Sequence, residues 1–313
     1  MTAIAIRGGG AAGSYLYRLL KDHKINAQLF DVTNSYFKAC GEAVTNAYSP
    51  KVPWKIIDEV HDFNFILDGT QVYSTHYRYP KWVIIDKQGW INSMRETALK
   101  PDKNVSWKNF DAVIDATGPY ARDRRVVCAI RAIVKTDQQA PGVTLEFNSK
   151  LTGFYWAFPS GSGKVNVGAG FMEVKNPKSL LLEYLRKKFP GKILSLMGAP
   201  ISIGKVRQKQ NRIGEARGLV FPVAGEGIRP AAISAEVAAD AIISGDEINA
   251  RLEEKLAHME NEIRAQRQLL SIYASLPPYL RRSLMKRLFK KEYIVDAYLS
   301  DEIGIWQSIS NII

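Results

Sequence analysis

The stretch IAIRGGGAAGSYLYRLLKDHKINAQLFD, residues 4–31, decides the fold of this 313-residue chain. It begins with an apolar run, places glycines at positions 8, 10 and 13 in the spacing GxGxxG, and continues with a helical pattern of apolar residues. A second apolar run follows and ends on Asp31. A strand, a tight turn, a helix and a second strand in this order are typical of a unit that binds a dinucleotide. We therefore expect such a unit at the start of the chain.

Each key residue of this motif has its own role in the predicted unit. Gly8 permits the turn, Gly10 lets backbone N–H groups approach a pyrophosphate, and Gly13 lets the helix pack closely. The first helical turn, at Ala12, directs a positive dipole end towards the phosphates. Asp31 ends the second strand, where a carboxylate accepts hydrogen bonds from ribose hydroxyls. A glycine-rich turn without a ligand is the alternative, but the surrounding strands and helix favour the dinucleotide.

Composition indicates an ordered globular protein with a large core. Apolar residues make up 46% of the chain and aromatic residues 10%, and this length is typical of two closely connected domains. No run approaches the roughly 18 consecutive apolar residues of a membrane-spanning helix. The N-terminus enters the first strand directly and leaves no room for a signal peptide, so we expect a cytoplasmic location.

The net charge of +12 suits nucleic acid, an anionic membrane surface or an acidic protein partner. No recognisable nucleic-acid module accompanies it, so we expect no nucleic-acid partner. The two cysteines, Cys40 and Cys128, are too few for a disulfide scaffold or a cysteine-based zinc site. The four histidines form no HxxxH pair. We therefore expect no metal.

Two later segments have the character of further nucleotide contacts. The run DAVIDATG, residues 111–118, is a strand that ends in the small residues Thr117 and Gly118. Such a turn lets the chain pass a bound nucleotide without a bulky side chain intruding, although an ordinary strand end is the alternative.

The second of these segments holds Gly214, Glu215, Gly225, Gly227 and Ile228. Glu215 is a candidate to accept hydrogen bonds from a ribityl chain. Gly225 and Gly227 are candidates to bring backbone amides to a flavin edge, with Ile228 beside them. An alanine-rich helix follows, and its N-terminus would stabilise negative charge on a reduced flavin. A glycine-rich turn that makes no cofactor contact is the alternative.

These motifs, with KACGEA at residues 38–43, give the chain a family resemblance. In the order GGGAAG, KACGEA, DATG and IGEARGLVFPVAGEGIRPA, the sequence resembles the geranylgeranyl reductase family of FAD-dependent oxidoreductases. That family lies within the wider p-hydroxybenzoate hydroxylase-like flavoprotein group, and the resemblance covers about residues 1–245. The chain is short for the family. The resemblance implies FAD as the cofactor and saturation of isoprenoid double bonds in a lipid or related isoprenoid as the activity.

The fold implied by this resemblance is α/β, with a three-layer Rossmann-like FAD-binding domain, an inserted antiparallel β-sheet substrate domain and a C-terminal helical region. The expected division is 1–50, 81–125 and 206–246 for the FAD-binding domain, 51–80 and 126–205 for the substrate domain, and 247–313 for the helical region. Within the substrate domain, alternation over 63–79 with Asp68-Gly69 in its middle predicts a β-hairpin.

A fifth motif is more specific to the reductases. Their substrate site has the pattern YxWxFP, then seven or eight residues, then GxG. The matching positions here are Phe154, Trp156, Phe158, Pro159, Gly168 and Gly170. The first aromatic residue is Phe instead of Tyr, which removes a hydroxyl and keeps the ring. The three aromatic residues also alternate onto one face of a strand, a surface that suits a long hydrocarbon or a plain sheet core.

The resemblance also places Cys40 and Gly41 in the active site beside the flavin. A buried inert thiol is the alternative for Cys40, and Cys128 follows no motif. Lys87 stands where relatives often have Arg, at a cofactor contact, and Glu215 stands where relatives usually have Asp. Both keep the charge of the residue they replace.

No catalytic triad or acid–base pair stands out, which fits an enzyme whose cofactor performs the hydride chemistry. Reduction of an alkene needs a hydride from the reduced flavin and a proton from the opposite side. Cys40, a tyrosine and water are the candidate donors of that proton. An FAD-dependent monooxygenase of an aromatic substrate and a non-catalytic flavin-binding electron carrier are the alternative functions.

The expected partners are an isoprenoid lipid and an electron donor, reduced ferredoxin or NADPH. The segment 277–291 holds six basic residues and no acidic one. If it is helical, Leu280, Leu284 and Leu288 share one face. This pattern is compatible with peripheral docking on the inner face of the cell membrane, and equally with a surface helix that packs on its own core.

Overall fold

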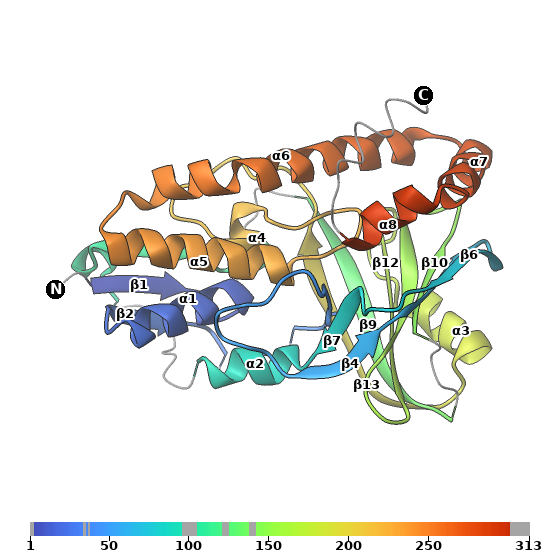
Figure 1. Cartoon of the computed structure of the whole chain (residues 1–313), viewed down its shortest axis with the longest axis horizontal. Helices are drawn as coiled ribbons and strands as arrows, with labels where there is room; N and C mark the ends of the chain where they lie inside the picture. The colour runs from blue at the N-terminus through green and yellow to red at the C-terminus, as the bar shows by residue number, and fades with distance from the viewer. Residues whose placement is uncertain are drawn as a thin grey trace.

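The computed structural model describes residues 3–33, 36, 38–95, 105–120, 125–137 and 142–300. The nucleotide-binding motif and a large sheet lie side by side, and three C-terminal helices extend across both (Figure 1). None of the helices in these ranges is long and apolar enough to cross a membrane. Residues 301–313 of the expected helical region lie outside the described part of the chain.

A three-stranded parallel sheet carries the N-terminal motif. Its order is β2 (Asn26–Phe30), β1 (Ala3–Arg7) and β8 (Ala112–Asp115). Helix α1 (Ala11–Asp22) joins β1 to β2 and buries the apolar residues that the helical pattern predicts, Tyr15, Leu16, Leu19 and Leu20. The predicted strand, turn, helix and strand are therefore confirmed.

Helix α5 (Ile228–Ser244) packs on α1, and α6 (Ile248–Ser275) packs on α5. The stacking places α5 between the parallel sheet and α6 (Figure 1). The short helix α4 (Gly214–Arg217) and the single turns η1 (Trp107–Asn109) and η2 (Gly118–Tyr120) complete this part.

A second three-stranded sheet has the order β3 (Ala43–Thr45), β7 (Trp82–Ile85) and β4 (Ile56–Val60). Helix α2 (Lys87–Ser93) follows β7 directly. Asp86 caps it, because its carboxylate accepts a hydrogen bond from the Gly89 N–H at 2.8 Å. Side chains of this sheet share one apolar core with α1 and α5.

The largest sheet has seven strands in the order β13-β9-β12-β11-β10-β5-β6. Their bounds are β5 (Asp62–Leu67), β6 (Thr70–His76), β9 (Val126–Lys135), β10 (Val143–Phe147), β11 (Gly153–Pro159), β12 (Lys164–Phe171) and β13 (Lys192–Ser202). Neighbouring strands are antiparallel, except that β10 runs parallel to β5. The expected antiparallel sheet thus contains one parallel pair. These two strands come from separate segments of the chain, so no hairpin turn sets their relative direction.

The predicted hairpin at 63–79 is confirmed as β5 and β6. Asp68 and Gly69 connect the strands with φ values of 50° and 79°. Two positive φ angles are what the tightest hairpin turns require, and an Asp-Gly pair adopts them readily.

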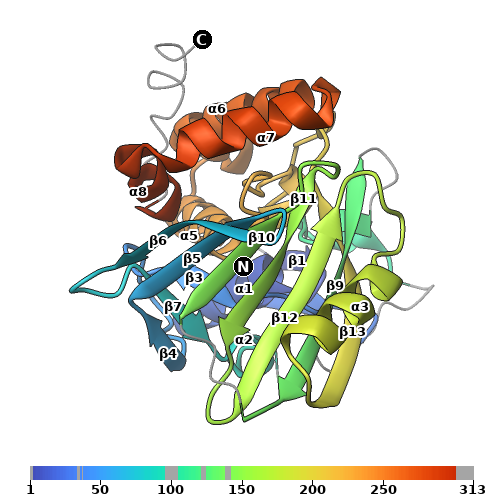
Figure 2. The same cartoon turned by 90° about the vertical axis from the view of Figure 1, so that its right-hand side faces the viewer.

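The two faces of the seven-stranded sheet have different coverings. Helix α3 (Lys178–Lys188) covers the outer face, where Tyr184 stacks on Tyr155 at 4.3 Å between ring centroids. The inner face is turned towards the nucleotide-binding motif, and α7 (Pro278–Phe289) and α8 (Glu292–Ser300) lie along its edge (Figure 2). Segments that are remote in the chain meet in this fold. The domain boundaries expected from the sequence stay a prediction.

The approach of α1 to the first turn allows a direct test. A Cβ atom added to Gly13 would stand 1.9 Å from the carbonyl oxygen of Gly8, whereas one added to Gly10 would meet nothing nearer than 4.0 Å. Alanine favours a helix over glycine by about 1 kcal/mol, but we expect this overpacking to outweigh that gain. Gly13→Ala should lower the free energy of unfolding by about 2 kcal/mol, as measured by urea denaturation.

Gly10→Ala is the matched control and should unfold within about 0.5 kcal/mol of the parent, the usual range for a change that meets no neighbour. Equal stability of the Gly13→Ala variant and the parent would contradict the close packing.

Candidate active site

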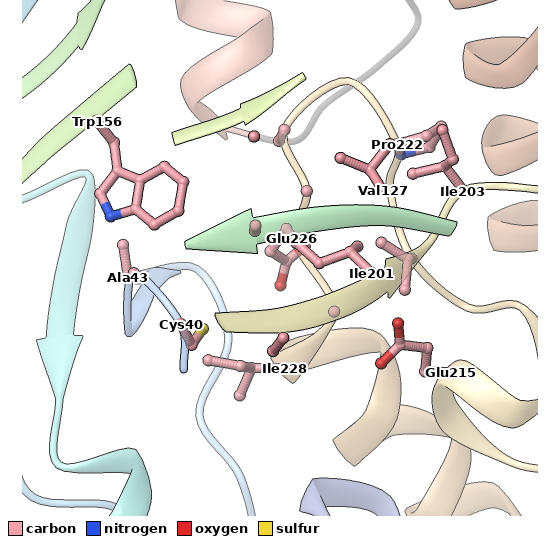
Figure 3. Close-up of a pocket in the computed structure, with 18 of the residues that line it drawn as sticks. Cys40, Ala43, Val127, Trp156, Ile201, Ile203, Glu215, Pro222, Glu226 and Ile228 are labelled. Atoms are coloured by element: carbon pink, nitrogen blue, oxygen red, sulfur yellow. The ribbon is translucent and has the colours of Figure 1, made fainter. Parts of the chain in front are cut away.

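One large cavity lies between the nucleotide-binding motif and the inner face of the seven-stranded sheet. Its volume is about 840 Å³, at the upper end of the range typical of small-molecule sites. Cys40 and Trp156 lie at one end of the part shown in Figure 3, and Ile203 lies at the other. The parallel sheet, the large sheet and the C-terminal helices all contribute walls, so the cavity forms only when these parts pack together.

The three predicted nucleotide segments meet at this cavity. Its lining includes Gly8, Gly10, Ala12, Asp31, Thr117, Gly118, Glu215, Gly225, Gly227 and Ile228. Gly13 and Gly214 are absent from the lining. A Cβ on Gly214 would stand 2.7 Å from the Ala12 Cβ, so Gly214, like Gly13, allows close packing behind the wall.

Glycines of the lining leave open space where other residues would place side chains. A Cβ on Gly10 or Gly118 would meet nothing nearer than 4.0 Å, and one on Gly225 would meet nothing within 4 Å. Backbone is therefore exposed to the cavity from three separate segments. Helix α1 also begins at Gly10, so its N-terminal amides and positive dipole end are directed at the same space.

Asp31 already has a charged partner. Arg95, whose side chain is only 2% exposed, forms an ion pair with the Asp31 carboxylate and donates to the Gly9 carbonyl at 2.9 Å. The remaining Asp31 oxygen accepts a hydrogen bond from Val32 N–H at 2.8 Å. The sequence offered no signal for Arg95, because it lies 64 residues from Asp31 and just after the end of α2. Asp31 is thus held rigidly at the cavity wall.

Glu215 is likewise engaged by the protein. Its carboxylate accepts a hydrogen bond from Ser202 N–H at 2.7 Å and forms an ion pair with Lys38 at 2.6 Å. Burial would lower the pKa of Lys38, but the charge of Glu215, its hydrogen bond to Lys38 and the nearby Tyr36 together outweigh this and raise it. Glu215 therefore ties the start of α4 both to the end of β13 and to the loop that precedes Cys40.

Residues 38–42, which we call the Cys40 loop, are fastened to the large sheet by Asn166. Asn166 is fully buried on β12 and donates to the carbonyl oxygens of Cys40 and Gly41 at 2.9 and 3.3 Å. Its own carbonyl accepts a hydrogen bond from the Trp156 indole N–H at 3.1 Å. Sequence reasoning missed Asn166 because it lies in the spacer of the aromatic motif. One buried amide thus fixes both the Cys40 loop and the ring of Trp156.

The aromatic motif divides into lining and supporting residues. Phe154, Trp156 and Phe158 share the inner face of β11 and line the cavity, as does Gly170. Gly168 does not line it, because the Trp156 indole covers it and a Cβ there would stand 2.0 Å from the ring. Pro159, the last residue of β11, also lies outside the lining. Gly168 therefore provides the space into which the indole packs.

A buried positive charge lies beneath the Cys40 loop. Lys87 donates to the Lys38 carbonyl at 3.1 Å, and its ammonium lies 5.1 Å from the centre of the Tyr36 ring. Burial would lower the pKa of Lys87, but Cys40 and Tyr36 nearby outweigh this and raise it. Burial raises the pKa of Glu42, and Lys87 partly offsets that rise. Lys87 therefore keeps its charge beside the sulfur of Cys40.

The C-terminal helices form an apolar roof over the cavity. The roof residues are Leu269, Leu270 and Tyr273 of α6, Leu284, Met285, Leu288 and Phe289 of α7, and Ile294, Val295 and Tyr298 of α8. The leucine face expected on 277–291 is therefore turned inward at two of its three positions. Leu280, the third, is 41% exposed. Helix α7 therefore packs on the protein's own core.

Within the described ranges, no group of three or more His, Cys, Asp or Glu side chains is arranged to hold a metal ion.

Comparison with known proteins gives sequence relatives for part of the chain, while no family model matches it. Digeranylgeranylglycerophospholipid reductase of Methanosarcina mazei is 33% identical over 118 residues, 33% of this chain and 29% of that protein. The reductase of the same name from Methanosarcina acetivorans is 35% identical over the same shares. Digeranylgeranylglycerophospholipid reductase 2 of Methanothermobacter thermautotrophicus is 30% identical over 132 residues, 38% of this chain and 34% of that protein. The matched part is thus about a third of these relatives' length.

Solved structures extend the likeness to the whole fold. A geranylgeranyl bacteriochlorophyll reductase-like protein from Thermoplasma acidophilum has a TM-score of 0.77 and covers 99% of both chains at 16% identity. A flavin-dependent brominase has a TM-score of 0.65, covering 94% of this chain and 92% of its own at 12% identity. The resemblance to geranylgeranyl reductases is confirmed over the matched part of the chain, and the expected α/β fold is confirmed over its whole length.

The anchoring of the Cys40 loop by Asn166 predicts a change in thiol reactivity. In a Cys128→Ser background, where Cys40 is the single thiol, Asn166→Ala should expose the loop and raise the alkylation rate of Cys40. The change removes the donor to two carbonyls, each bond contributing about 1 kcal/mol, so we expect a rise of roughly thirtyfold. Asn148→Ala, in the turn after β10, is the control. A rate equal to that of the Cys128→Ser parent would mean that the loop is held elsewhere.

Proposed function

We propose that this protein is an FAD-dependent oxidoreductase that saturates isoprenoid double bonds, in a lipid or a related isoprenoid. The observation that carries the proposal is the large cavity, which joins three nucleotide-binding segments to an aromatic and aliphatic interior. The sequence relatives are named as reductases of a prenylated glycerophospholipid, which supports the substrate class. These relatives match only about a third of this chain, so the activity is inferred from the site.

The residues of the cavity fit FAD. Exposed backbone at Gly10, Gly118 and Gly225 allows close approach to a pyrophosphate and a flavin edge without obstruction by side chains. The N-terminus of α1 offers amide donors and a positive dipole to the phosphates. Asp31, fixed by Arg95, would accept hydrogen bonds from the adenosine ribose. When bound and reduced, the flavin supplies the hydride that an unactivated double bond requires.

The protein's own part in the reaction is to orient the alkene and exclude water. Phe154 and Trp156 offer flat apolar surfaces for an isoprenoid chain. The roof of α6, α7 and α8 closes the cavity above them, which strengthens electrostatic interactions inside it. Cys40, held by Asn166 and next to the charge of Lys87, is the proposed residue that positions the substrate or donates the proton.

Partners of the proposed reaction follow from charge. A net charge of +12 favours docking of an acidic electron donor such as reduced ferredoxin, with NADPH as the alternative. Peripheral contact with a membrane would have to rely on the basic side chains of α7, since Leu284 and Leu288 line the cavity. Of these basic side chains, Arg282 lies 3.4 Å from the Asp68 carboxylate.

Cofactor binding is tested by Gly10→Val. The purified parent should carry FAD, identified by extraction and chromatography. The added side chain would enter the open space at Gly10, so the variant should lose FAD while keeping its circular dichroism. Gly245→Asn changes a glycine in open space at the end of α5 and serves as the control. Bound NAD in the parent, or FAD retained by Gly10→Val, would contradict the proposed cofactor site.

The reaction is tested by incubating the protein with prenylated lipid and chemically reduced flavin, and counting added hydrogen pairs by mass spectrometry. Cys40→Ser should retain FAD and slow the reduction by about a hundredfold or more, the lower end of the range for loss of a proton donor. Cys128→Ser is the matched control and should react as the parent does. Oxygen consumption with an aromatic substrate, and no hydrogen added to the alkene, would favour a monooxygenase.

A further inference from the structure

A buried arginine faces the main cavity from the large sheet. Arg131 lies on β9, is only 8% exposed and lines the cavity. Its neighbour across the ladder is Gly168 of β12, which in turn pairs with Trp156 of β11. Directly paired residues of antiparallel strands point to the same face of a sheet, and the Trp156 indole covers Gly168. Arg131 therefore belongs to the end of the cavity at which Figure 3 shows Trp156 and Cys40.

The protein satisfies this guanidinium only in part. Its Nη1 donates to the hydroxyl of Ser195 on β13 at 3.1 Å. The buried Nε–H of Arg131 has no hydrogen-bond partner among the described residues, and no ion pair to Arg131 is formed within the described ranges. A buried donor without a partner costs free energy. The Nε–H is therefore an open position for an acceptor atom of a ligand in the cavity.

The charges around Arg131 favour an oxygen atom that becomes negative. Glu42 of the Cys40 loop also lines the cavity and interacts electrostatically with Arg131 without forming an ion pair. Burial raises the pKa of Glu42, which weakens it as a counter-charge, and Lys87 is a second cation that acts on it. Asp86 acts on Glu42 as well, but its carboxylate caps α2. Two cations thus face one weakened carboxylate at this end of the cavity.

The ligand group that matches these charges is a carbonyl oxygen. A guanidinium only donates hydrogen bonds, so its partner has to accept them. A carboxylate would bring a second negative charge close to Glu42. A ketone oxygen is neutral when it binds, and it becomes negative only when hydride adds to a double bond conjugated with it. The aromatic and aliphatic lining of the cavity suits an apolar chain attached to such a ketone.

We propose that the protein has a further activity, the reduction of α,β-unsaturated ketones that carry an apolar chain, with Arg131 binding the ketone oxygen. Hydride, for which the reduced flavin is the source, adds to the alkene carbon remote from the carbonyl, and the π electrons move onto the oxygen as an enolate. The Nε–H of Arg131 stabilises this charge as a preorganised donor. A proton from water then adds to the carbon beside the carbonyl, and the C=O bond re-forms. The activity shares the reduced flavin with the proposed isoprenoid reduction but not the need for a carbonyl.

Binding to the FAD-loaded, oxidised protein tests the ketone subsite without turnover. Calorimetry compares three probes of one carbon skeleton: pseudoionone, a conjugated ketone; geranylacetone, a ketone without the conjugated double bond; and pseudoionol, which has a hydroxyl in place of the carbonyl. Arg131→Met should weaken the binding of both ketones by about tenfold and that of pseudoionol by less. Arg186→Met changes an exposed arginine of α3 on the outer face of the sheet and is the matched control.

Turnover is followed by mass spectrometry, because reduction of the conjugated double bond of pseudoionone yields geranylacetone. With chemically reduced flavin, the parent should form geranylacetone. Arg131→Met should lower kcat by about a hundredfold, the lower end of the range for losing one donor to a developing oxyanion. Arg131→Lys keeps the charge without the Nε–H donor and should lose less.

The outcomes separate this activity from the isoprenoid reduction. Equal ketone binding by the parent and Arg131→Met, or no geranylacetone from the parent, would overturn the further activity, while reduction of the prenylated lipid by the same preparation would keep the isoprenoid reductase proposal. Loss of FAD from Arg131→Met would assign the guanidinium to the cofactor and also overturn the ketone subsite. Ser195→Ala removes only the hydrogen bond that orients the guanidinium. It should weaken ketone binding by about threefold, which gives the comparison if Arg131→Met fails to fold.

Discussion

The contact between Gly13 and Gly8 is the constraint on which the nucleotide side of the structure depends. A side chain on Gly13 would collide with the Gly8 carbonyl at 1.9 Å and would stand 3.0 Å from the Ala116 Cβ. Only a residue without a side chain lets α1 start so close to both β1 and the end of β8. Because the start of the helix is fixed there, its amide-rich N-terminus opens on the cavity instead of on solvent.

The Cys40 loop is held at its start and in its middle. The Asp31–Arg95 pair fixes the chain that leads into it, Lys38 binds Glu215, and Asn166 binds the backbone at Cys40. Buried ion pairs contribute little to net stability, but removing one partner leaves an uncompensated charge and costs roughly 3–5 kcal/mol. These charges therefore act mainly to specify one position of the loop. A thiol held in this way has a defined place relative to any ligand in the cavity.

The C-terminal helices change the character of the large sheet. Without them, the aromatic inner face of β11 and its neighbours would be an exposed apolar surface, which soluble proteins rarely keep. Leu284 and Leu288 of α7 cover it while leaving the cavity beneath, and the pairing of Arg282 with Asp68 joins the helix to the β5–β6 turn. The roof thus supplies the apolar upper wall of the cavity.

The sequence by itself determined the local units, because glycine spacing and apolar periodicity are properties of neighbouring residues. It predicted the strand, turn and helix of residues 4–31, the hairpin at Asp68-Gly69, and the shared face of Phe154, Trp156 and Phe158. Tertiary structure alone decided which remote residues meet, since Arg95 reaches Asp31 and Asn166 reaches Cys40 across 64 and 126 residues. It also decided the parallel pairing of β5 with β10 and the inward orientation of the leucine face. No local pattern encodes these contacts, because they arise when separate segments bury their surfaces against one another.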